Sequence, residues 1–177
     1  MTEQTQVKIV PAASLSDDEV QRLVTLINDA YARHRWLFPN PRTSVDGFLP
    51  EIGNAEVILL LVLPDSAASY KKIVGTAYVH TDDDALYFGM AAVDPNWQSR
   101  GLGGKLLETV EELARQRKLA KIRLLAAVEI GNEAYYLKRG YKTVATLDCP
   151  PGTWDALSAH KRVTMEKQVS QNLDKEG

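Results

Sequence analysis

The stretch that most restricts how this chain folds is residues 85–118, which run from an apolar segment through a glycine-rich turn into a helical pattern. The letters ALYFGMAAV predict a buried strand at residues 85–93, and GKLLETVEELARQRK has the spacing of an amphipathic helix. Between them lies VDPNWQSRGLGG, whose glycines let the backbone pass close to a ligand. The first N–H groups of a helix have no acceptor within it, so such a helix start favours anions, and phosphate above all. The stretch therefore predicts a site for a phosphate-bearing ligand.

Two common nucleotide-binding patterns fail at this turn. A P-loop requires G-x-x-x-x-G-K-[ST], but Ser99 stands at its first glycine and Leu106 at its hydroxyl position. The dinucleotide fingerprint requires a third glycine three residues after Gly103, where Leu106 stands instead. We therefore expect a phosphate-bearing cofactor of another class.

The apolar periodicity of the whole chain predicts one α+β domain. Strands are expected at residues 7–10, 56–63, 73–80, 85–93, 121–128, 141–146 and 162–169. Short polar turns join the second, third and fourth strands into an antiparallel meander, whereas the helix between the fourth and fifth makes a βαβ unit with a parallel strand pair. Gly89, inside a strand, indicates a bulge or a close backbone approach. We expect the domain to span residues 1–177, folded over about 7–169, with short disordered termini.

The composition argues against several classes of partner. A formal net charge of −2 favours neither nucleic acid nor an anionic membrane. The single cysteine, Cys149, allows no internal disulfide and suits a reducing compartment. The three histidines lack the spacing of metal ligands, so no metal is expected. The longest apolar run, residues 57–63, is too short to span a bilayer, and the N-terminus does not resemble a signal peptide. The cytoplasm, with the nucleus reached by diffusion, is the expected location.

A third glycine pattern, Q/R-x-x-G-x-G/A, fits QSRGLG at residues 98–103. Val93 and Pro95 precede it, and NEAYYLKRGY follows at residues 132–141. With these segments the chain resembles the GNAT superfamily of acyl-CoA-dependent N-acyltransferases, over about residues 7–169. The resemblance implies a mixed central sheet of about seven strands flanked by helices and splayed between the fourth and fifth strands. It also implies acetyl-CoA as co-substrate and transfer of its acetyl group to a primary amine by direct attack.

The same resemblance implies roles for individual residues. The turn would bind the CoA pyrophosphate through Gln98, Ser99, Arg100, Gly101, Leu102, Gly103, Gly104 and Lys105. The strand end would pair with the pantetheine arm through Ala91, Ala92 and Val93, and Asn132 would reach the same arm. Tyr136 matches the tyrosine that the family places near the thiol sulfur, where its phenol would act as a general acid.

The sequence leaves alternatives for the base and the acceptor. A primary alkylamine of pKa about 10.4 is neutral only about once in 2500 molecules at pH 7, so a base or a water relay is required. Glu129 is the expected base, with His34 and Glu56 as alternatives. The aromatic, proline-rich segment after the first helix suggests substrate contacts by His34, Trp36 and Phe38. A peptide amine, a polyamine and a small xenobiotic amine all stay open as acceptors, and so does a homodimer. The alternative function is a non-catalytic CoA-binding or protein-interaction domain on the same fold.

Overall fold

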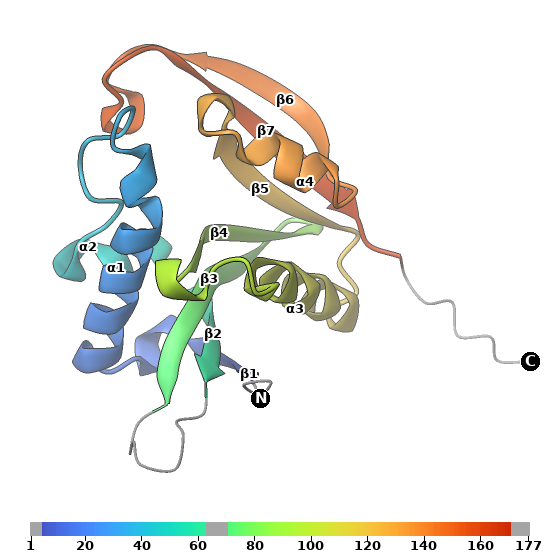
Figure 1. The fold of residues 1–177 in the computed structure, drawn as a ribbon. Coiled ribbons are helices and arrows are strands. Elements are labelled where there is room, and N and C mark those ends of the chain that lie inside the picture. The colour runs from blue at the N-terminus through green and yellow to red at the C-terminus, as the bar shows by residue number, and fades with distance from the viewer. Residues whose placement is uncertain (1–4, 63–70, 171–177) are drawn as a thin grey trace, which may run out of the picture.

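The chain is organised around one mixed β-sheet, which the computed structural model places between helices (Figure 1). The structure describes residues 5–62 and 71–170, and the expected disordered termini fall largely outside these ranges. The strands are β1 (Thr5–Pro11), β2 (Glu56–Val62), β3 (Lys72–Asp82), β4 (Ala85–Val93), β5 (Lys121–Ala127), β6 (Lys142–Cys149) and β7 (His160–Gln168). They lie in the order β1-β2-β3-β4-β5-β7-β6, and only β4 and β5 are parallel neighbours. The predicted seven-stranded mixed sheet is confirmed.

The principal helices flank this sheet. They are α1 (Asp17–Tyr31), α2 (Val45–Ile52), α3 (Leu102–Gln116) and α4 (Asn132–Leu137). The Ser16 hydroxyl accepts a hydrogen bond from the Glu19 N–H, and the Glu19 carboxylate accepts one from the Ser16 N–H. This capping box satisfies two backbone donors at the start of α1. None of the helices in the described part of the chain is long and apolar enough to cross a membrane.

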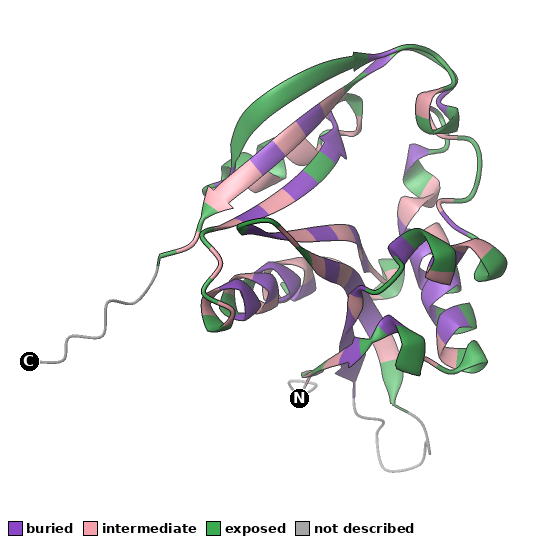
Figure 2. Ribbon diagram, turned by 180° about the vertical axis from the view of Figure 1, so that it is seen from behind, coloured by how far each residue is buried: buried purple, intermediate pink, exposed green. Residues whose placement is uncertain are grey.

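Strand β2 shows why the sheet requires helices on both faces. Its residues Ile58, Leu60 and Val62 belong to an apolar core that includes α3. The alternate residues Val57, Leu59 and Leu61 belong to a second core, formed with α1 and α2. Both sets are buried, which explains a run of apolar residues without alternation. In Figure 2 buried and intermediate residues alternate along the central strand β4, whereas β6 at the edge of the sheet is exposed.

The parallel pair β4–β5 is paired over only three positions. Ala85, Leu86 and Tyr87 lie opposite Lys121, Ile122 and Arg123, and the pairing then stops. Beyond this point β4 stays paired with β3 as far as Val93, while β5 stays paired with β7. The predicted splay is therefore present, and Figure 1 shows β4 and β5 separating toward α1.

A β-bulge in β4 lies beside this opening. Thr76 pairs with Ala92 and Tyr78 pairs with Gly89, so two residues of β4 lie opposite one residue of β3. Met90, inside the bulge, has a φ of 47°, in the left-handed region. The extra residue exchanges the faces of the strand, because Phe88 packs in the α3 core whereas Met90 packs in the α1 core. Gly89 also approaches a neighbour closely, so both expectations for this glycine hold.

We expect Gly89→Ala to lower the free energy of unfolding by about 1–3 kcal/mol, as overpacking does. A Cβ at this position would lie 2.6 Å from the Tyr78 ring. That ring packs against His80, which stacks at 6.2 Å between centroids, and against Tyr87 at 6.0 Å, in a cluster of three rings. Urea unfolding of the variant, alone and combined with Tyr78→Leu, measures the effect. Removal of the ring should recover most of the loss, and an equal loss in both backgrounds would refute this cause.

Candidate active site

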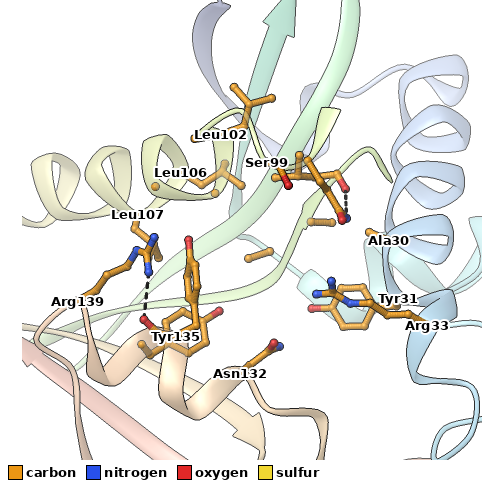
Figure 3. Close-up of a pocket in the computed structure, with 18 of the residues that line it drawn as sticks. Ala30, Tyr31, Arg33, Ser99, Leu102, Leu106, Leu107, Asn132, Tyr135 and Arg139 are labelled. Atoms are coloured by element: carbon orange, nitrogen blue, oxygen red, sulfur yellow. Dashed lines mark hydrogen bonds between the residues drawn. The ribbon is translucent and has the colours of Figure 1, made fainter. Parts of the chain in front are cut away.

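The turn at residues 98–104 opens onto a cavity of about 360 Å³ beside the start of α3 (Figure 3). Gly101 precedes the helix with a φ of 80°, which glycine adopts most readily. No side chain caps this helix start, so the N–H groups of Leu102, Gly103 and Gly104 have no acceptor within the helix. A Cβ at Gly104 would meet no atom within 4 Å, so the site leaves room close to the backbone. The start of α3 therefore offers backbone donors to an anion.

The end of β4 forms the neighbouring wall of this first cavity. The Gln98 Nε2 donates to the Val93 carbonyl at 3.2 Å and joins the turn to the strand end. Most of the residues predicted to hold the cofactor line this cavity. They are Ala91, Ala92, Val93, Gln98, Ser99, Gly101, Leu102, Gly103, Gly104 and Asn132.

Two predicted cofactor residues have other contacts. The Arg100 guanidinium lies over the Trp97 ring, 4.5 Å from its centroid. The Lys105 ammonium donates to the carbonyl of Thr5, the first residue of β1, at 3.0 Å. Neither is among the residues that line the first cavity. The spacing in the sequence places both in the motif, but it does not show that the helix turns Lys105 toward the sheet edge.

The opposite wall contains a pair of residues that the sequence pattern did not single out. Tyr135, on α4, places its hydroxyl 2.9 Å from the position of a Cβ at Gly103. The Arg139 guanidinium stacks on the Tyr135 ring at 3.6 Å and donates to the Tyr135 carbonyl at 3.2 Å. In Figure 3 these two face Tyr31 and Arg33 of the segment at the end of α1 across the cavity. The i,i+4 spacing of Tyr135 and Arg139 is the signal that could have revealed the pair.

A second cavity, of about 410 Å³, lies between β4, β5 and the segment after α1. Its wall is rich in aromatic rings: Tyr31, Phe38, Tyr78, Tyr87, Phe88, Tyr136 and Trp154. Phe38 lies 6.5 Å from the Trp154 ring and 5.3 Å from the His160 ring. The backbone N–H of Leu157 also donates to the Leu37 carbonyl at 2.8 Å, which joins the β6–β7 loop to the segment after α1.

The two cavities share part of their walls where β4 and β5 separate. The shared residues are Tyr31, His34, Ala91, Asn132 and Tyr136. All but Tyr31 were predicted from the sequence as site residues. The Tyr136 ring packs against Phe88 at 6.1 Å and Tyr141 at 5.6 Å. Burial raises the pKa of the Tyr136 phenol above its ordinary value, so the hydroxyl stays protonated at neutral pH.

His34 lies on the α1 side of this junction and is only 8% exposed. Its Nε2 accepts a hydrogen bond from the Arg33 Nε at 3.2 Å. Burial, with a smaller contribution from the Arg33 charge, lowers the pKa of His34, so its ring is neutral at pH 7.

Three other predicted residues lie outside both cavities. Glu129 is exposed, and its carboxylate accepts hydrogen bonds from the Lys161 N–H at 2.9 and 3.1 Å, so the expected base lies at the surface and lines neither cavity. Trp36 is 59% exposed, and Glu56 forms an ion pair with Arg117. Within residues 5–62 and 71–170, no three His, Cys, Asp or Glu side chains gather as metal ligands would.

The fold is that of the N-acyltransferases: a mixed sheet with one splayed parallel pair and an uncapped helix start after β4. The two cavities meet in the splay. Residues 23–141, well over half of the chain, match the model of the acetyltransferase (GNAT) family. The chain belongs to this family. A comparison with curated protein sequences gives no match.

Solved structures of the same fold extend over nearly the whole chain. The ribosomal-protein-S18-alanine N-acetyltransferase of Escherichia coli has a TM-score of 0.70 at 18% identity, covering 97% of this chain and 98% of its own. A putative N-acetyltransferase from Lactobacillus plantarum has a TM-score of 0.66 at 19% identity, with 94% and 99% covered. An acyl-CoA N-acyltransferase from Pseudomonas aeruginosa has a TM-score of 0.65 at 15% identity, with 93% and 99% covered. At these identities the likeness concerns the fold.

Proposed function

We propose that this protein transfers an acetyl group from acetyl-CoA to a primary amine by direct attack. The observation that carries the proposal is the junction at Tyr136, where a cavity beside an uncapped helix start meets a second, aromatic cavity. The first cavity would hold acetyl-CoA and the second the amine. GNAT acetyltransferases act on amines, and this arrangement allows the two substrates to approach from opposite sides of the splay.

The first cavity is lined by groups that suit the phosphates and the pantetheine arm of CoA. The free N–H groups at the start of α3 suit a pyrophosphate, and each such charge interaction is worth about 0.3–1 kcal/mol when exposed. Arg33 and Arg139 also line this cavity and add positive charge. Ala91, Ala92 and Val93 would supply a strand end for the pantetheine arm, and Asn132 lines the same cavity. Arg100 would contribute through its backbone, whereas the Lys105 ammonium is bonded to Thr5 and is not assigned a role in binding CoA.

Tyr136 is the proposed general acid. Acetyl-CoA supplies an activated acetyl group as a thioester, and the thiol is the leaving group. A phenol of pKa about 10 donates to a thiolate of pKa about 8.5 at a cost of roughly 2 kcal/mol, and burial of Tyr136 increases this cost in the free protein. A bulge leaves its extra residue out of the strand ladder, so a main-chain N–H near Ala91 is proposed to polarise the acetyl carbonyl. Glu129, exposed and bonded to Lys161, is not retained as the base.

Two measurements on the wild-type chain test the proposal. We expect isothermal titration calorimetry to detect binding of acetyl-CoA, and CoA itself serves as the comparison ligand. We further expect thiol release, followed with a thiol reagent, to depend on both acetyl-CoA and an amine. Binding without amine-dependent thiol release would favour the non-catalytic CoA-binding function, and absence of binding would exclude both functions.

A further inference from the structure

The walls of the two cavities carry more positive than negative charge. The arginines among the lining residues are Arg33, Arg35, Arg42 and Arg139, and the carboxylates are Glu51 and Asp155. The two arginines of the first cavity suit an anionic cofactor. Arg35 and Arg42 line the second cavity, where the proposed amine would bind. In the second cavity an alkylammonium ion would therefore meet two arginines as well as two carboxylates, and one of these carboxylates is already paired.

Neither carboxylate of the second cavity is arranged to hold an ammonium ion at the junction. Glu51 is bonded to the Arg42 guanidinium at 2.8 Å, so its charge is already paired. Asp155 is exposed and belongs to the loop between β6 and β7, next to Trp154. The five residues that line both cavities, where the transfer is proposed to occur, include no carboxylate.

The remaining titratable groups around the second cavity are uncharged at neutral pH. Burial raises the pKa of Tyr31, Tyr78 and Tyr87, so these phenols carry no negative charge. Tyr136 behaves in the same way, and the pKa of His34 is lowered. The wall is thus a set of aromatic rings and neutral hydroxyl groups, with the Arg42–Glu51 pair and two exposed charges, Arg35 and Asp155.

From this lining we infer that the acceptor is a weakly basic primary amine on an aromatic body, and that it enters the second cavity uncharged. The inference rests on the proposed function and specifies its substrate. The aromatic rings of Phe38, Tyr78 and Tyr87 suit an aromatic body, since offset and edge-to-face ring contacts are favourable. An α-amino group next to an aromatic side chain and an arylamine share this chemistry.

An uncharged acceptor also balances the protons of the reaction without a base. The amine nitrogen forms a bond to the acyl carbon, and the bond from that carbon to sulfur breaks. The nitrogen gives up one proton and the sulfur gains one, so no proton is left over. Tyr136, at the junction, can donate to the sulfur and regain a proton from the nitrogen. This explains why a junction lined by no carboxylate is sufficient.

A matched pair of amines tests the inference: phenylalaninamide, with an α-amino group, and phenethylamine, with an alkylamine on the same ring. An α-amino group of pKa about 7.7–8.0 is neutral in about one molecule in eight at pH 7, against about one in 2500 for an alkylamine. We expect kcat/KM at pH 7 to favour phenylalaninamide by roughly 300-fold at equal intrinsic reactivity. From pH 7 to pH 9 the value should rise about 100-fold for the alkylamine and about eightfold for phenylalaninamide.

Different results separate a wrong inference from a wrong function. Efficient turnover of phenethylamine at pH 7 with a flat profile to pH 9 would overturn the inference and leave the acetyltransferase function intact. Binding of acetyl-CoA with no acetylation of either amine, of a peptide beginning with Phe or of an aniline would overturn both. A preference for the peptide beginning with Phe would identify an α-amino group as the weakly basic nitrogen, and a preference for the aniline would identify an arylamine.

A pair of variants tests the wall charge itself. Arg42→Gln removes the partner of Glu51 and leaves an unpaired carboxylate in the second cavity, at a position where both side chains are about one-third exposed. We expect phenethylamine to show a KM at pH 7 about tenfold lower with this variant, because an ammonium ion then has a counter-charge. The double variant Arg42→Gln/Glu51→Gln should return KM to the wild-type value. Equal KM values in the single and double variants would contradict the selection against ammonium ions.

Discussion

Gly103→Glu should remove acetyl-CoA binding from a chain that still folds. The substitution places a carboxylate at the start of α3, where the backbone N–H groups lack acceptors. Two like charges about 4 Å apart repel by about 4 kcal/mol near a protein surface, which corresponds to roughly a thousandfold loss of affinity. The new side chain would also crowd the Tyr135 hydroxyl, which lies 2.9 Å from the added Cβ. Calorimetric titration with acetyl-CoA measures the loss, and circular dichroism checks the fold.

Gln116→Glu is the matched control for this variant. It adds the same charge to the same helix, but at an exposed position at the far end of α3. We expect its affinity for acetyl-CoA to stay within about twofold of wild type, because a screened charge more than a Debye length away has little effect. Equal affinities for Gly103→Glu and Gln116→Glu would show that the phosphates bind elsewhere.

Tyr136→Phe is expected to reduce kcat by about 100-fold or more while acetyl-CoA still binds, since general acid catalysis contributes 10²–10⁴-fold. The ring contacts with Phe88 and Tyr141 do not require the hydroxyl, so the variant should keep its fold. Because the pKa of this phenol is raised above 10.0, the acid form persists through neutral and mildly alkaline pH. The wild-type activity should therefore not fall from pH 7 to pH 10 through loss of this proton.

The Tyr141 hydroxyl provides a control of the same size. It is buried without a hydrogen-bond partner among the described residues, and Tyr141 lines neither cavity. Tyr141→Phe removes the same atom from the neighbouring ring, and we expect kcat to change less than about twofold and stability to be unchanged or slightly raised. If both variants lost turnover equally, packing rather than proton donation would explain the effect of Tyr136.

Much of the fold could be predicted from the sequence because helix starts and strands depend on short patterns of residues. The capping hydroxyl of Ser16 accepts from a residue three positions along the chain, and the unbroken apolar run of β2 already indicates that both faces of the strand are buried. The turn and Tyr136 could likewise be placed from the sequence, because a short helix start and a motif at fixed spacing bring them to the splay.

The parts of the site that the sequence could not place depend on contacts between distant segments. Glu129 follows a strand that lines the second cavity, but its carboxylate accepts hydrogen bonds from the Lys161 N–H at the start of β7, 32 residues further along the chain. Trp36 and Phe38 lie two residues apart, and only Phe38 faces the second cavity. The pairing of Arg42 with Glu51 joins two ends of one segment around α2, and no periodicity indicates it.

The most direct test of acetyl transfer at the junction is the stoichiometry of one reaction. Wild-type protein is incubated with acetyl-CoA and phenylalaninamide, released thiol is titrated, and the acetylated amide is quantified by mass spectrometry. We predict one acetylated amide for each thiol released, with both lost together in Tyr136→Phe. Thiol release without acetylated amide, or no release although acetyl-CoA binds, would contradict the proposed transfer.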